Sequence, residues 1–173
     1  MATDPRDTLW KYSFDTYYDA YFEELLADSL IKRWMRIDFG VKIIVALTAS
    51  GSAVAGLTLW NEPGLKAVWA AISLIAAVGS IFHTTVQAAN LIKEHTKSNA
   101  DFASLRNGLE DFRRDLNIHP QFDVDSKNAE FDKLRKKYDE CSRNTPRDWT
   151  VTDRFRIRIK NILNDAIRDQ IRT

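Results

Sequence analysis

The predicted fold rests on IIVALTASGSAVAGLTLW (Ile43–Trp60) and AVWAAISLIAAVGSIFHTTVQAANLI (Ala67–Ile92), two stretches without a charged residue. Between them Pro63-Gly64 signals a tight turn. A helix that crosses a bilayer needs about 20 apolar residues. The pair therefore predicts a transmembrane hairpin, with spans at about 41–60 and 67–90 and the turn at 61–66. A hairpin buried in a helical bundle is the alternative, although neither stretch has the charged face of an amphipathic helix.

Composition excludes two broad classes of protein. The 173 residues carry a net charge of +1, which argues against the basic footprint of a nucleic-acid-binding protein. Cys141 is the only cysteine, so the chain forms no intrachain disulfide. The 28% of residues that are charged lie outside the two apolar stretches.

Basic residues flank the outer ends of both apolar stretches, whereas the turn carries only Lys66. The flanking residues are Lys32, Arg33, Arg36, Lys42, Lys93, Lys97 and Arg106. Because cytoplasmic loops carry an excess of lysine and arginine, this asymmetry places both termini in the cytoplasm. It predicts a multi-pass membrane protein with the turn on the outer side.

The rest of the chain has helical periodicity, so the predicted fold class is all-α. Residues 1–38 form an N-terminal amphipathic cytoplasmic helix, residues 39–92 the hairpin and residues 93–173 a C-terminal cytoplasmic helical region. A helix over Lys93–Asn117 carries an apolar stripe that is expected to pack in a cytoplasmic bundle or coiled coil. The stripe consists of Phe102, Leu105, Leu109, Phe112 and Leu116. Two further helices are expected, one after the capping residues Asp123–Asn128 and one over about Thr152–Ile171.

A second stripe, of small and polar residues, alternates by three and four along the second apolar stretch. It consists of Ser73, Ala76, Ser80, His83, Gln87 and Asn90. Polar groups facing lipid are costly, so this stripe should face protein or water. It can be a hydrogen-bonded seam between helices or the lining of a pore in an oligomer.

Catalytic, cofactor-binding and metal-binding motifs are absent from the sequence. His83, His95 and His119 are far apart, with no cysteine or second histidine at metal-site spacing. The sequence lacks a phosphate-binding glycine-rich loop. Cys141 falls on an apolar stripe and is expected to be a small core residue. We therefore predict that the protein is not an enzyme.

Three segments together resemble the SLATT family, the two-transmembrane effectors associated with bacterial nucleotide-signalling conflict systems. They are KRWMRIDFGVK at 32–42, NEPG at 61–64 and NLIKEHTKSNADFASLRNGLEDFRRDL at 90–116. The resemblance implies a bacterial inner-membrane protein that a nucleotide second messenger or a sensor protein activates. It also implies that the protein oligomerises and permeabilises the membrane in antiviral (antiphage) defence.

Two functions follow as predictions. The first is a pore-forming or membrane-disrupting effector whose partners are the lipid bilayer, further copies of itself and a nucleotide signal or sensor. The second is a non-conducting membrane anchor or adaptor whose cytoplasmic helices recruit another protein.

Overall fold

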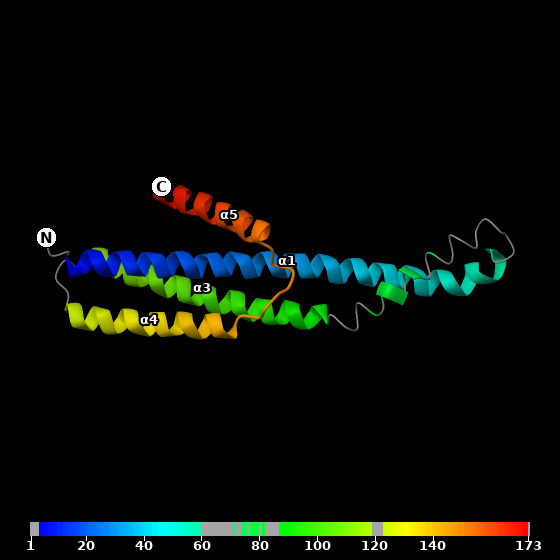
Figure 1. Ribbon diagram of the computed structural model, residues 1–173, viewed down its shortest axis with the longest axis horizontal. Helices are drawn as coiled ribbons and strands as arrows, with labels where there is room; N and C mark the ends of the chain where they lie inside the picture. The colour runs from blue at the N-terminus through cyan, green and yellow to red at the C-terminus, as the bar shows by residue number, and fades with distance from the viewer. Residues whose placement is uncertain are drawn as a thin grey trace. The chain divides into compact units, whose positions relative to one another are not determined.

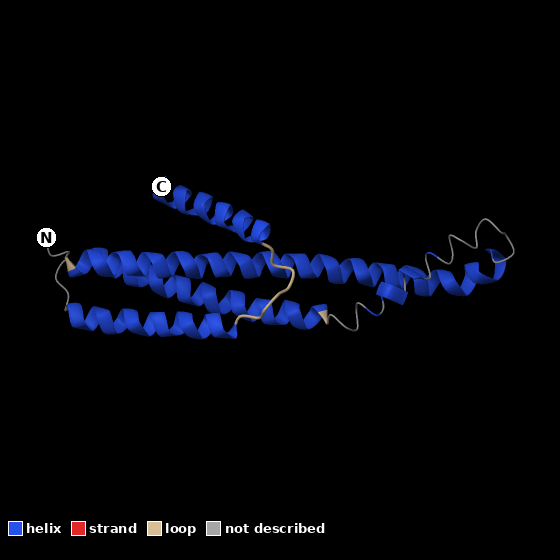
Figure 2. Ribbon diagram, in the orientation of Figure 1, coloured by secondary structure: helices blue, strands red, loops and turns tan. Residues whose placement is uncertain are grey.

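A computed structural model describes residues 4–59, 71, 74–75, 77–79, 81, 87–118 and 123–172 (Figure 1). Within these residues four helices have defined bounds, and residues 71, 74–75, 77–79 and 81 are also helical. The helices are α1 (Pro5–Leu59), α3 (Ala88–Ile118), α4 (Val124–Asn144) and α5 (Asp153–Arg172). Among the described residues no strand is present, as Figure 2 shows.

The chain divides into two compact units. One unit joins Met1–Leu30 with Glu94–Thr173, and the other spans Ile31–Lys93. The sequence suggested boundaries after residues 38 and 92. In the structure, residues 1–30 and 94–173 pack together as one unit.

The apolar stripe of α3 forms the core of the first unit. The five side chains at 102, 105, 109, 112 and 116 are each at most 2% exposed. They are joined by Leu9, Tyr17 and Ala20 of α1 and by Phe131 and Cys141 of α4. The rings of Phe112 and Phe131 stack with centroids 5.8 Å apart. Spacings of three and four place one face of α3 inside this core, which explains the periodicity.

Two arginines of α3 also contact α1. Arg106 Nε donates to the Glu24 carboxylate at 2.6 Å. Arg113 lies over the Trp10 ring at 4.3 Å and over the Phe14 ring at 4.9 Å, a cation–π geometry. Burial lowers the pKa of Arg113. Arg106, which the sequence suggested as a flanking charge of a membrane span, thus joins two helices.

Helices α4 and α5 begin and end where local signals predict. Asp123 is the N-cap of α4 and accepts a hydrogen bond from the Asp125 N–H at 3.2 Å. Helix α4 stops at Asn144, before Pro146. On α5, Ile159 and Leu163 are buried. The start of α5, where basic and apolar residues alternate, is helical, as expected. Figure 1 shows α4 and α5 on different sides of α1.

Gly108 faces α4 at close range, and its replacement by alanine is expected to be mildly stabilising. A Cβ there would lie 3.3 Å from Leu134 Cδ2, the far end of a flexible side chain. Glycine in a helix interior costs about 1 kcal/mol relative to alanine, so Gly108→Ala should raise the free energy of unfolding by up to about 1 kcal/mol. Urea denaturation measures this change. Gly40→Ala, whose Cβ meets nothing within 4 Å, reports the propensity term alone. A lower midpoint for Gly108→Ala would show that Leu134 cannot move aside.

The structure corrects the predicted transmembrane hairpin. Over the residues that it describes, no helix has both the length and the apolar character required to cross a membrane. The first predicted span is not a separate helix. Helix α1 continues from Pro5 to Leu59 through the break expected near residue 38. Asp38 and Lys42 form an i,i+4 ion pair at 2.5 Å within it.

The second predicted span does not run unbroken into α3 either. Gln87 has a φ of 45°, a conformation that leaves the right-handed helix, and α3 begins at Ala88. The sequence criterion counted missing charges, whereas a span requires one uninterrupted apolar helix. The predicted transmembrane hairpin and the multi-pass inner-membrane location are therefore wrong. The pore-forming role, which depends on them, loses its support.

Candidate functional site

A cavity of about 560 Å³ lies in the first unit, between α1, α3, α5 and the 145–152 loop that follows α4. Small-molecule sites in proteins usually have volumes of about 300–1,000 Å³. The cavity combines an apolar floor, a hydrogen-bonded polar wall and a rim of basic side chains. We therefore take it as the candidate functional site.

The apolar floor comes from consecutive turns of α1. Leu26, Ala27 and Leu30 are each at most 5% exposed and line the cavity. Residues 26 and 30 are one helical turn apart, so they lie on the same face of α1. Pro146 and Val151 of the loop add apolar surface. This floor can accept the apolar body of a ligand.

The polar wall is a buried histidine–aspartate pair. His95 Nε2 on α3 lies 3.1 Å from Asp148 Oδ2 in the loop, and both side chains are only 1% exposed. Since a carboxylate can only accept, the imidazole N–H donates. The other carboxylate oxygen, Asp148 Oδ1, accepts from the Thr150 N–H at 2.7 Å. The pair therefore attaches the loop to α3.

Hydroxyl groups continue this wall towards the end of α4. Thr145, the C-cap residue of α4, donates from Oγ1 to the Cys141 carbonyl at 2.9 Å. Ser98 Oγ of α3 lies 3.4 Å from the same hydroxyl. These two side chains place hydrogen-bonding groups beside the buried pair.

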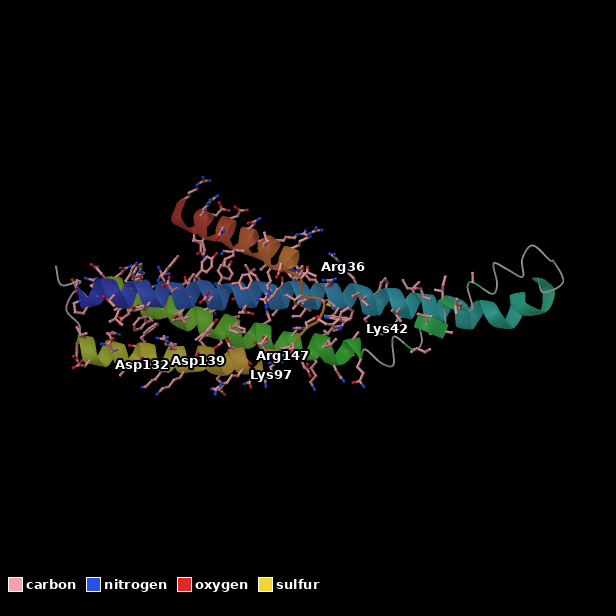
Figure 3. All side chains as sticks on the ribbon, in the orientation of Figure 1. Arg36, Lys42, Lys97, Asp132, Asp139 and Arg147 are labelled. Atoms are coloured by element: carbon pink, nitrogen blue, oxygen red, sulfur yellow. The ribbon has the colours of Figure 1, made fainter. Side chains whose placement is uncertain are left out.

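Three arginines form the rim: Arg143 at the end of α4, Arg147 in the loop and Arg156 on α5. All three are exposed, and among the described residues no ion pair within 4.0 Å involves their guanidinium groups. Figure 3 labels Arg147 beside the end of α4. Guanidinium groups match phosphate and carboxylate in geometry. The rim therefore has the chemistry of an anion-binding site.

Glu23 of α1 opposes this positive charge from inside the cavity. Burial raises the pKa of its carboxyl, Arg156 partly offsets this effect, and Asp19 adds to it. Asp148, the second carboxylate of the lining, is already hydrogen-bonded to His95 and to the Thr150 N–H.

Most of the predicted polar stripe lies outside the described residues. This applies to Ser73, Ala76, Ser80 and His83. The remaining two members, Gln87 and Asn90, contact each other where α3 begins. The Asn90 side-chain amide donates to Gln87 Oε1 at 2.6 Å.

Cys141, which the sequence predicts to be a small core residue, lies in the core. Burial there raises the pKa of its thiol. A cysteine with a raised pKa is a poorer nucleophile. Within the described residues, no group of three or more histidine, cysteine, aspartate or glutamate side chains is arranged to hold a metal ion.

Sequence reasoning missed the cavity and its histidine–aspartate pair. His95 was placed just outside a membrane, and Asp148 was not considered. The only local signal was Asp148 two residues before Thr150, a spacing typical of an Asx turn. Its partner is 53 residues away in the sequence.

Comparison of the chain with protein-family models, with curated proteins and with solved structures found no match.

Proposed function

We propose that this protein is a non-enzymatic helical receptor that binds a small organic anion in the cavity of its first unit. The phosphate or carboxylate of the ligand contacts the rim arginines, and its apolar body rests on the α1 floor. The observation that carries the proposal is that three arginines line the same cavity as an apolar floor. A nucleotide, the trigger implied by the resemblance to SLATT effectors, belongs to this ligand class.

Ligand binding in this cavity would join parts of the unit that are distant in sequence. Arg156 belongs to α5, Arg147 to the loop and Leu26 to α1. A ligand that contacts all three stabilises their packed arrangement, because binding only to the folded state adds to its stability. In this proposal the protein is an adaptor whose first unit is stabilised when a small molecule binds.

Recruitment of another protein, or of a second copy, is the second candidate function. Large apolar side chains are exposed at and just before α5, where Trp149 is 75% and Ile157 59% exposed. Exposed apolar groups of this size often mark interaction surfaces. Such a surface is compatible with ligand binding in the cavity.

The receptor function predicts that Arg156→Gln weakens anion binding about tenfold. A charge-assisted hydrogen bond at an exposed site contributes on the order of 1.4 kcal/mol, which is a factor of ten in affinity. Isothermal titration calorimetry with 1-naphthyl phosphate and 1-naphthalenesulfonate measures this loss. The uncharged analogue 1-naphthol should bind more weakly than either anion.

Arg154→Gln is the matched control, because Arg154 is an exposed arginine of the same helix that does not line the cavity. Its affinity should equal that of the wild type. If both substitutions weakened anion binding equally, the loss would come from the change in net charge and not from a contact between Arg156 and the ligand. No saturable binding of either anion to the wild type would refute the receptor function.

A further inference from the structure

Glu23 has an unusual position for the binding of an anion. It lines the cavity from α1, whereas the positive charges approach from the other segments: Arg156 from α5, Arg143 from the end of α4 and Arg147 from the loop. An anion seated at these arginines would meet the charge of the Glu23 carboxylate within the same cavity. Two like charges in one partly buried site repel each other strongly.

Other titratable groups near Glu23 lie on α1, α4 and α3. On α1, Asp19 lies one turn before it and adds negative charge. On α4, Tyr138 interacts electrostatically with both carboxylates, and its own pKa is raised chiefly by burial. On α3, His95 is hydrogen-bonded to Asp148. Arg156 is therefore the group that most favours the ionised form of Glu23.

We propose that the cavity binds its organic anion together with one proton, which Glu23 takes up from solvent and uses to donate a hydrogen bond to the ligand. This inference rests on the proposed receptor function. No covalent bond forms or breaks: a carboxylate, a proton and the anion give a neutral carboxylic acid hydrogen-bonded to the bound anion. Glu23 then acts as a residue that selects ligands with an acceptor atom near α1.

The direction of the effect follows from the charges. Burial and Asp19 already raise the pKa of Glu23, and Arg156 holds it down. A bound anion neutralises Arg156 and adds a negative charge, so both changes raise the pKa of Glu23 further. Proton uptake should therefore accompany binding wherever the free carboxyl is ionised, and affinity should fall as pH rises.

The experiment is isothermal titration calorimetry of the full chain with 1-naphthalenesulfonate, whose sulfonate does not titrate near neutral pH. Titrations in PIPES and in Tris, which differ in ionisation enthalpy, give the number of protons taken up. For the wild type we expect up to about one proton per ligand at neutral pH and above. Affinity should fall by up to about tenfold per pH unit over the range where uptake is complete.

Glu23→Gln should bind without proton uptake and with little dependence on pH, because its amide donates a hydrogen bond at every pH. At pH 8.5 it should therefore bind more tightly than the wild type. Glu140→Gln is the control, since Glu140 is exposed on α4 and does not line the cavity. On ligand binding, Glu140→Gln should take up as many protons as the wild type.

The outcomes separate this inference from the receptor function. Wild-type binding without proton uptake would overturn the role of Glu23 and leave the receptor function standing. Uptake that persists in Glu23→Gln would assign the proton to another group and also overturn the inference. Absence of any binding to the wild type would refute the receptor function, and the inference with it.

Discussion

Replacing Leu109 and Phe112 of α3 by alanine together is expected to unfold the first unit. Both side chains are at most 2% exposed, and Phe112 stacks on Phe131 of α4. Leucine-to-alanine substitutions in cores cost about 2–5 kcal/mol and phenylalanine-to-alanine about 3–5 kcal/mol. Domains are stable by only about 5–15 kcal/mol. The double variant should therefore lose most of its cooperative thermal transition in circular dichroism.

The two sites are close, so their effects need not be additive, and each single variant should be measured as well. Asn107→Ala with Asp111→Ala is the matched control, because both residues lie exposed on the same helix. Surface substitutions of this kind usually change stability by less than about 0.5 kcal/mol each. A melting temperature unchanged in the core double variant would mean that this face of α3 is not buried.

His95→Leu is expected to lower the free energy of unfolding by about 3 kcal/mol. Leaving a buried charge without the partner that compensates it costs about 3–5 kcal/mol. The lower end of that range applies because the Thr150 N–H still donates to Asp148 Oδ1. The carboxylate, which is 1% exposed, then loses its imidazole partner. Urea denaturation followed by circular dichroism measures the loss.

A double-mutant cycle tests the cause of this loss. Asp148→Asn removes the charge and keeps an oxygen for the Thr150 N–H. Added to His95→Leu, it should recover about 1–2 kcal/mol, because a buried charge that has lost its imidazole partner is replaced by a neutral amide. Asp132→Asn, on the exposed side of α4 and labelled in Figure 3, should recover nothing. A His95→Leu variant as stable as the wild type would show that the pair does not hold the loop.

Local patterns in the sequence predicted much of the helical structure. The spacing of Phe102, Leu105 and Leu109 indicated which face of α3 is buried, and all three are fully covered. Asp123, one of several candidate capping residues, is the N-cap of α4, and Asn144 before Thr145-Pro146 marked its end. These features depend on residues within one or two turns of each other, so the sequence alone contains them.

The absence of charged residues from two stretches predicted the fold less well than periodicity and capping did. It suggested separate spans, whereas α1 is one helix from Pro5 to Leu59. The backbone leaves the helical conformation at Gln87, although neither glycine nor proline stands there. Hydropathy counts residues and does not report where a helix begins or is interrupted.

Patterns along the chain were enough to predict the helices of the first unit and the faces that these helices bury, and they contain no recognisable catalytic motif. The three-dimensional structure was needed to place the bounds of that unit at Leu30 and Glu94. It also decided that His95 meets Asp148 and that three arginines surround one cavity. Periodicity and capping act within a few residues, whereas a cavity arises where helices distant in sequence pack against one another.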